Sequence, residues 1–242
     1  MRNVVTSLLL TCLLPLTTLA QQGTLTYKMT GVGPKPTKTT LYFADGNFRA
    51  ESEIPLPDNP KKKMTQVVLF RNDKPNTMVV LNNTTQTYTE IATKRMTNSL
   101  KTTVNVIGRE KVKKYDCTHS VMTVTTGGKS FQTDYWTTRE IAGYEQLTAF
   151  WRNNAGMNDA YETLRENGAD GMTVKMATNR GGKAITMELD DYSKRKVSPK
   201  LFEIPAGYKK GASFDPAQLQ KMTPAQRKEF AEGMMKQQKG KP

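Results

Sequence analysis

Hydrophobic and polar residues alternate along the first part of this chain. Leu25, Tyr27 and Met29 fall on one side of the run, and Lys28 with the threonines falls on the other. A period of two is typical of a strand that buries one face and leaves the other in solvent. The alternation therefore predicts a half-buried strand that begins near Gly23.

The next two alternating runs, residues 39–44 and 47–54, are separated by Asp45-Gly46. This dipeptide favours the tight hairpin turn whose residues need positive φ. Counting outward from the turn pairs Phe43 with Phe48 and Leu41 with Ala50, so that all four side chains share one face. The turn and the pattern agree on one register for this hairpin.

Further runs indicate a chain made mainly of strands. Residues 64–71 and 77–81 are densely apolar, which indicates strands covered on both faces. The segment 55–63, rich in proline and lysine, is predicted to be a loop. The other predicted strands are 86–91, 104–112, 114–125, 130–136, a closing pair in which Met172, Val174 and Met176 alternate inward and Ile185, Met187 and Leu189 alternate back, and an extended run at 200–208.

Two stretches carry a helical pattern instead. Tyr144, Leu147, Phe150 and Trp151 form one apolar stripe, and Thr137 or Thr138 is predicted to cap this helix. A weaker second helix is predicted from the spacing of its apolar residues: Met157, Ala160, Tyr161 and Leu164. The sequence thus places two helices between groups of strands.

The two ends of the chain differ from its middle. Residues 1–20 have a charged start, a short apolar run and small residues before Gln21, which is the pattern of a secretory signal peptide. No later run is long enough to span a membrane. Residues 211–242 form a basic tail with two short predicted helices, each with a proline at its start. We therefore expect an exported protein, periplasmic or secreted, with one domain at 21–210.

Charge and cysteine content restrict the function. The chain has 36 basic and 22 acidic residues, a formal net charge of +14. Outside the cytoplasm such a charge favours anionic lipid, surface polymer or acidic protein as partners, rather than nucleic acid. Cys117 is the only cysteine beyond the predicted leader, so an intramolecular disulfide is excluded.

No set of residues in the sequence matches a catalytic or cofactor site. Cys117 and His119 share a strand face, but Asp116 points to the other face and cannot orient the imidazole. One histidine and one cysteine cannot supply the ligands of a zinc site. The Gly-Lys-Ser run at 128–130 lies between two strands and is interpreted as a hairpin turn. We expect no enzyme activity and no cofactor.

The chain contains 13 methionines, and several fall at inward strand positions. Methionine fills irregular space and suits adaptable apolar surfaces. The pattern fits either a packed core or the wall of a cavity that accepts lipid. The inward positions are Met29, Met78, Met122, Met172, Met176 and Met187.

Several short motifs resemble exported bacterial proteins that contain the domain of unknown function 4412. They span about residues 23–210: Gly23 to Met29, the hairpin around Asp45-Gly46, Gly108 to Val112 followed by Tyr115-Asp116-Cys117, Tyr135-Trp136 with Ile141 to Tyr144, and Phe202 to Tyr208. These proteins are similar to the lipoprotein-carrier superfamily (LolA/LolB-like). That resemblance implies a mainly β, α+β fold: an unclosed antiparallel β-barrel with covering helices, which often holds an acyl chain or a peptide segment.

Pattern and resemblance together favour a non-enzymatic binding protein whose apolar inner face accepts a lipid or lipid-modified partner, including a lipoprotein. The alternative is a structural or regulatory module of the cell envelope with a filled core, whose basic tail or exposed sheet edge binds an acidic protein or a surface polymer. The predicted ligand-lining residues are Phe43, Phe48, Met78, Val121, Trp136, Tyr144, Leu147, Phe150 and Trp151.

Overall fold

Twelve strands form a single sheet in the computed structural model, which describes residues 22–31, 33–56, 59–83, 85–93, 101–145, 147–148, 158–211 and 223. Their order is β12-β6-β5-β4-β3-β2-β1-β11-β10-β9-β8-β7. Neighbouring strands are antiparallel, except that β12 runs parallel to β6. The sheet is open, because its edge strands β12 and β7 do not pair with each other.

The bounds of the elements follow the chain from the first strand to the last. They are β1 Gly23–Thr30, β2 Thr37–Ala44, β3 Asn47–Leu56, β4 Asn59–Phe70, β5 Thr77–Asn82, β6 Thr87–Ala92, β7 Lys101–Val112, β8 Tyr115–Thr126, β9 Lys129–Thr138, α2 Asn158–Glu166, β10 Met172–Arg180, β11 Lys183–Ser193, the 3-10 helix η1 Pro199–Phe202, and β12 Lys209–Lys210.

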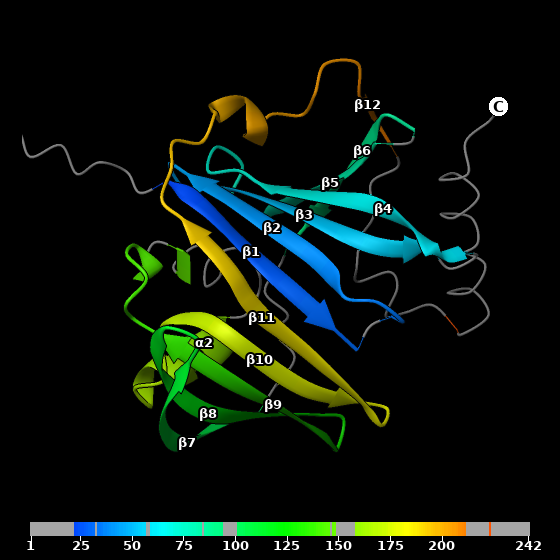
Figure 1. Ribbon diagram of the computed structural model, residues 1–242. Helices are drawn as coiled ribbons and strands as arrows, with labels where there is room; N and C mark the ends of the chain where they lie inside the picture. The colour runs from blue at the N-terminus through cyan, green and yellow to red at the C-terminus, as the bar shows by residue number, and fades with distance from the viewer. Residues whose placement is uncertain are drawn as a thin grey trace, which may run out of the picture.

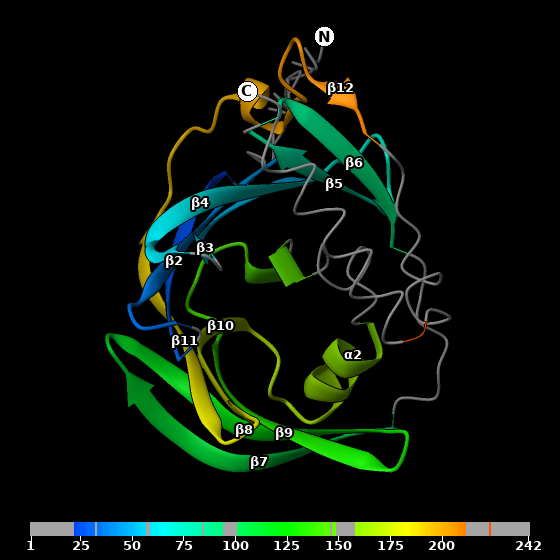
Figure 2. The same cartoon turned by 90° about the vertical axis from the view of Figure 1, so that its right-hand side faces the viewer.

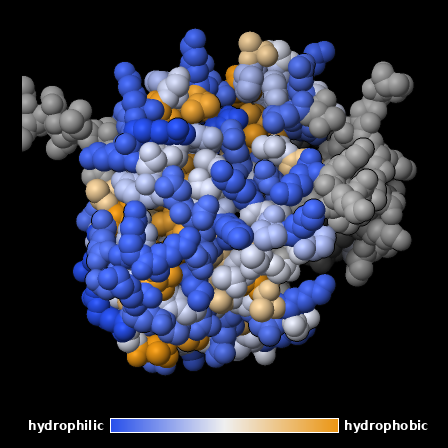
Figure 3. Space-filling view, in the orientation of Figure 1, coloured by the Kyte–Doolittle hydropathy of each residue, from blue (hydrophilic) through white to orange (hydrophobic). Residues whose placement is uncertain are grey.

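The sheet curves strongly, so that its two wings face each other across a hollow (Figures 1 and 2). Strands β5 and β6 lie at one side of this hollow, β7, β8 and β9 lie at the other, and α2 lies within it (Figure 2). The outer side of the sheet, which faces the viewer in Figure 1, is mainly hydrophilic (Figure 3). The apolar faces of most strands are therefore turned toward the hollow.

The β2–β3 hairpin has the register that the sequence predicts. Phe43 is paired with Phe48 and Leu41 with Ala50, and Asp45 and Gly46 both take positive φ in the turn. The rings of Phe43 and Phe48 stack with their centroids 6.2 Å apart. This hairpin forms one wall of the main hydrophobic core.

Strands β4 and β5 are covered on both faces, which confirms the prediction from their dense apolar runs. Val68, Phe70 and Met78 contribute to the main core. On the other face, Val67, Leu69, Val79 and Leu81 form a second cluster beneath Ile204 and Tyr208. A third cluster joins Ala44 to Val197 and Phe202. The segment after β11 therefore covers the outer face of β2, β4 and β5.

Two predicted segments differ in the structure. Residues 55–56 and 59–63 are strand and not loop, because β3 and β4 continue and pair Pro55 with Lys63 and Leu56 with Asn59. Pro55 lies at a register shift between these strands, where a strand tolerates a missing donor. Residues 199–202 are a 3-10 helix rather than extended chain, with Pro199 at its start, where the fixed φ of proline favours a helical turn.

The first predicted helix is described only at Tyr144, Glu145, Leu147 and Thr148, which are helical. Neither Thr137 nor Thr138 caps it, because β9 runs to Thr138. The Thr137 hydroxyl donates to Ala169 O, and the Thr138 hydroxyl accepts from the Glu140 amide. The prediction that helices cover the open side remains a prediction.

Strand β10 contains a bulge between Thr173 and Lys175. Because of this extra residue, Met172 and Met176 do not follow the simple alternation through Val174 that the sequence predicts. No helix among the described residues is long and apolar enough to cross a membrane. The predicted leader at 1–20 and the predicted tail helices lie outside the described residues.

Candidate ligand-binding site

A cavity of about 430 Å³ lies between the curved sheet and α2. Its volume is within the range of small-molecule sites, about 300–1,000 Å³. Strands β1, β2, β3, β8, β9, β10 and β11 supply one wall, and Ala160, Tyr161 and Leu164 of α2 supply the other. The remaining lining residues are Tyr27, Met29, Thr39, Leu41, Ala50, Ser52, Met122, Tyr135, Thr137, Thr148, Gly171, Met172, Thr173, Met176 and Met187.

Five methionines line this cavity: Met29, Met122, Met172, Met176 and Met187. Three of them form one row across the sheet, because Met29 is paired with Met187 and Met187 with Met176. Tyr135 is paired with Met176 and extends the row into β9. Met29, Met176 and Met187 remain only half-buried, so their flexible side chains have free space before them.

The hydroxyl of Tyr27 makes a hydrogen bond within the protein at the edge of the cavity. It donates to Thr173 O at 2.9 Å. Burial raises the pKa of both Tyr27 and Tyr135 above the ordinary tyrosine range. Both phenols are therefore neutral at physiological pH, and the cavity presents an uncharged, mainly apolar wall to a ligand.

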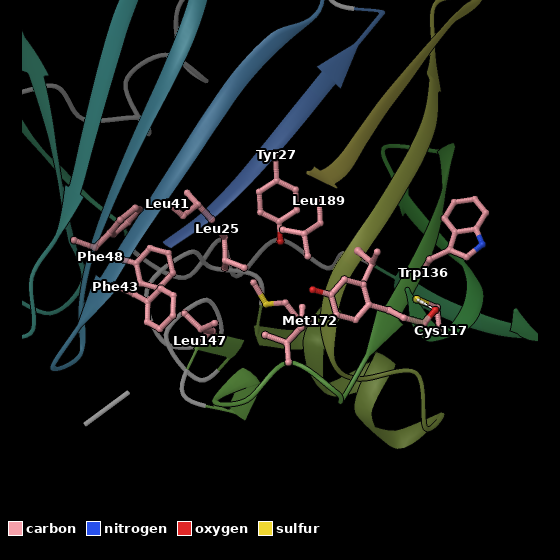
Figure 4. Close-up of a cluster of buried hydrophobic side chains, with 14 residues drawn as sticks. Leu25, Tyr27, Leu41, Phe43, Phe48, Cys117, Trp136, Leu147, Met172 and Leu189 are labelled. Carbon is pink, nitrogen blue, oxygen red and sulfur yellow. Dashed lines mark hydrogen bonds between the residues drawn. The ribbon is translucent and has the colours of Figure 1, made fainter. Parts of the chain in front are cut away.

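The predicted lining residues lie mostly beside this cavity and do not form its wall. Phe43, Phe48, Leu147 and Trp136 belong to the main hydrophobic core, and Met78 and Tyr144 pack against it. Phe43 and Phe48 lie next to Leu147, and Trp136 lies apart from them near Cys117 (Figure 4). Phe150 and Trp151 fall outside the described residues. The prediction that these side chains contact a ligand remains a prediction.

Val121 and Trp136 project away from the cavity. Trp136 follows Tyr135, a cavity residue, and successive side chains of a strand point to opposite faces. Val121 precedes Met122, another cavity residue, and is only half-buried. Alternation along each strand predicts which side chains share a face. It does not predict which face of β8 and β9 turns toward the hollow.

Sequence analysis did not select Thr39, Ala50, Ser52 and the α2 residues as lining candidates. The predicted register of the β2–β3 hairpin already indicates that some of these residues face the hollow. It places Thr39 opposite Ser52 on the face of Leu41 and Ala50, and the structure has this pairing. Small side chains at these positions leave the space that becomes the cavity.

Cys117 is fully buried and its environment does not activate it. Its thiol makes a weak contact of 3.7 Å with Tyr115 O. Burial raises the pKa of the Cys117 thiol to about 11, so the reactive thiolate is scarce at neutral pH. Its neighbour along the face, His119, is engaged elsewhere and does not activate it.

His119 belongs to a polar and aromatic cluster on the face opposite the cavity. Its Nε2 lies 2.8 Å from Asp134 Oδ1, and its Nδ1 lies 3.3 Å from Glu110 Oε1. The imidazole stacks on the Trp136 ring, with ring centroids 4.3 Å apart. Lys175 Nζ lies over the Trp136 ring, 4.3 Å from its centroid. The carboxylates that sequence analysis could not find for His119 come from β7 and β9.

Within the described ranges, no group of three or more His, Cys, Asp or Glu side chains is arranged to hold a metal ion. The described residues therefore form an apolar cavity and not a metal site. The cavity is an apolar concavity in an open antiparallel sheet, closed on one side by a short helix.

This chain belongs to the family of the domain of unknown function 4412, which it matches over residues 22–208. No curated protein sequence matches it. Among solved structures, it is similar to LprF from Mycobacterium bovis, with 11% identity and a TM-score of 0.34 over 75% of this chain and 88% of that chain. It is also similar to a DUF1329 family protein from Desulfovibrio piger, with 10% identity and a TM-score of 0.32 over 76% and 90% of the two chains.

Proposed function

We propose that this protein is an exported, non-enzymatic binding protein that holds an acyl chain of a lipid or lipid-modified partner. The observation that carries the proposal is the 430 Å³ cavity with its five methionines. Flexible thioether side chains adapt to an acyl chain, which itself has many conformations. The uncharged phenols and the small residues along the wall favour an apolar ligand over a charged one.

Lipid extraction tests the proposal directly. The protein is purified from the organism that makes it, and its organic extract and its intact mass under native conditions are measured. We expect a bound lipid that is lost on denaturation. Protein that carries no lipid and also fails to bind cis-parinaric acid, a fluorescent fatty acid, would contradict the proposal.

A variant that fills the cavity makes the test specific. Ala160 lies on the α2 wall, so Ala160→Trp removes space without adding charge. Ala184→Trp is the matched control, because Ala184 is exposed in β11 and does not line the cavity. We expect at least about tenfold weaker cis-parinaric acid binding for Ala160→Trp and no change for Ala184→Trp. Ala160→Leu, a smaller change, guards against loss of folding.

A further inference from the structure

A second, polar pocket of about 310 Å³ adjoins the apolar cavity. Thr137 lines both, so the two spaces share a wall. The polar pocket is lined by Arg109, Asp116, Thr118, Thr137, Thr138, Arg139, Glu140, Gly168 and Asp170. An apolar space beside a pocket of charged and hydroxyl groups matches an amphiphile, in which a polar headgroup is joined to an apolar chain.

The register of the sheet places lining residues of the two spaces in one row. Arg109 is paired with Thr118, Thr118 with Thr137, and Thr137 with Thr173, so that four polar residues form one row from β7 to β10. Directly paired side chains lie on the same face of a sheet. Arg109 and Thr118 line the polar pocket and Thr173 lines the apolar cavity. The row therefore leads from a charged end into the methionine-lined space.

The charges in the polar pocket are only partly neutralised by one another. Arg139 pairs with Asp170, whose side chain is only 8% exposed. Glu140 accepts a hydrogen bond from the Asp116 amide. Among the described residues, the side chains of Arg109 and Asp116 have no ion-pair partner, and both are exposed at the mouth of the pocket. Glu140 likewise has no ion-pair partner among the described residues, so the pocket offers one unpaired cation and two unpaired carboxylates, a set that can hold both charges of a zwitterion.

A buried hydroxyl lies between the two spaces. Ser120 is fully buried, and its Oγ has no hydrogen-bond partner among the described residues. It lies between Thr118 of the polar pocket and Met122 of the apolar cavity, on the same face of β8. Leaving a buried hydroxyl unpaired is unfavourable. Ser120 itself lines neither space, so its hydroxyl belongs to the wall between them and is not counted among the ligand contacts.

We infer that the ligand is a zwitterionic amphiphile, with a phosphate beside Arg109, an ammonium group beside Asp116, and its acyl chain in the methionine-lined cavity. This inference rests on the proposed function for the chain-binding half of the site. The headgroup half rests on the polar pocket and its unpaired charges alone.

Binding is measured with three probes of defined chemistry, each below its micelle concentration: a lysophosphatidylethanolamine, a monoacylglycerol with the same chain, and a lysophosphatidic acid. Arg109→Gln is expected to weaken binding of lysophosphatidylethanolamine about tenfold or more, and to leave binding of the uncharged monoacylglycerol unchanged. Arg195→Gln is the control for net charge, because Arg195 is exposed and lines neither space.

Asp116→Asn tests the ammonium position separately. It should weaken binding of lysophosphatidylethanolamine but not that of lysophosphatidic acid, which has no amine. If Arg109→Gln and Asp116→Asn leave lysophosphatidylethanolamine binding unchanged while Ala160→Trp abolishes it, the headgroup inference is wrong and the proposed function stands. If the unmodified protein binds none of the three probes, the proposed function itself is wrong.

Discussion

The hydroxyl of Tyr27 in β1 donates a hydrogen bond of 2.9 Å to the main-chain oxygen of Thr173 in β10. These strands are not neighbours, because β11 lies between them. The bond thus reaches across a whole strand, which requires a strongly curved sheet. It joins the two wings at the wall of the apolar cavity.

Replacing Tyr27 by phenylalanine should reduce the free energy of unfolding by about 1–2 kcal/mol, because the Thr173 carbonyl loses its partner in a poorly hydrated place. Urea unfolding measures the change. Tyr161→Phe is the matched control, since Tyr161 lines the same cavity and its hydroxyl makes no hydrogen bond to another described residue. Equal losses in the two variants would show that the interstrand bond has no special role.

The Cys117 thiol should resist modification at neutral pH and react with a maleimide only after denaturation. Its pKa is raised from an ordinary 9.0 to about 11, so the unfolded state loses its proton first as the pH rises. The stability linked to this group is complete below pH 9 and is lost as the pH rises to about 11. The expected loss is about 3 kcal/mol, because each pKa unit corresponds to about 1.4 kcal/mol. Comparing unfolding free energies of wild type and Cys117→Ala across this window isolates the effect; parallel curves would contradict it.

His119 and Trp136 should be energetically coupled, because their rings stack and both contact Glu110. A double-mutant cycle with His119→Ala and Trp136→Leu is expected to give a coupling of about 0.5–1.5 kcal/mol. The control cycle combines His119→Ala with Phe202→Ala, which lies in a separate cluster and should be additive. A coupling no larger than that of the control would refute the stack as a stabilising contact.

Phe202 should be a strong contributor to stability even though it lies outside the sheet. It is 5% exposed and covers the outer face of β2 together with Val197. Phe202→Ala should cost about 3–5 kcal/mol, while Leu201→Ala, at a partly buried neighbour, should cost less. Thermal or urea unfolding measures both. A larger loss for Leu201→Ala would overturn this view of the outer cluster.

Much of the sheet could be predicted from the sequence because turn chemistry and alternation point the same way. Asp45-Gly46 fixes the register of β2 and β3, and Phe43 meets Phe48 as that register requires. Where the local signals conflict, the prediction is wrong. The prolines predicted a loop at 55–63, yet strand pairing continues as far as Leu56 and Asn59. Long-range pairing there outweighs local propensity.

The site could be predicted only in part, since alternation tells which side a residue faces but not whether the space before it is filled. Phe43 and Phe48 face inward and meet Leu147, so that region is packed. Met176 and Met187 also face inward, but helix α2 presents Ala160 to the same space, and room remains. Whether an inward-facing region is packed or hollow depends on side chains that are far away in the sequence. The periodicity of one strand does not predict which side chains these are.

The pairing of β1 with β11 determines when folding can be completed. Met29 near the start of the domain pairs with Met187 near its end, so this seam between the wings has a large loop-closure cost. Until β11 emerges and pairs, the two wings are separate sheets with exposed edges and no shared cavity. We therefore expect the seam to form late, and a chain that stalls before it to be prone to aggregation through the free edge of β1.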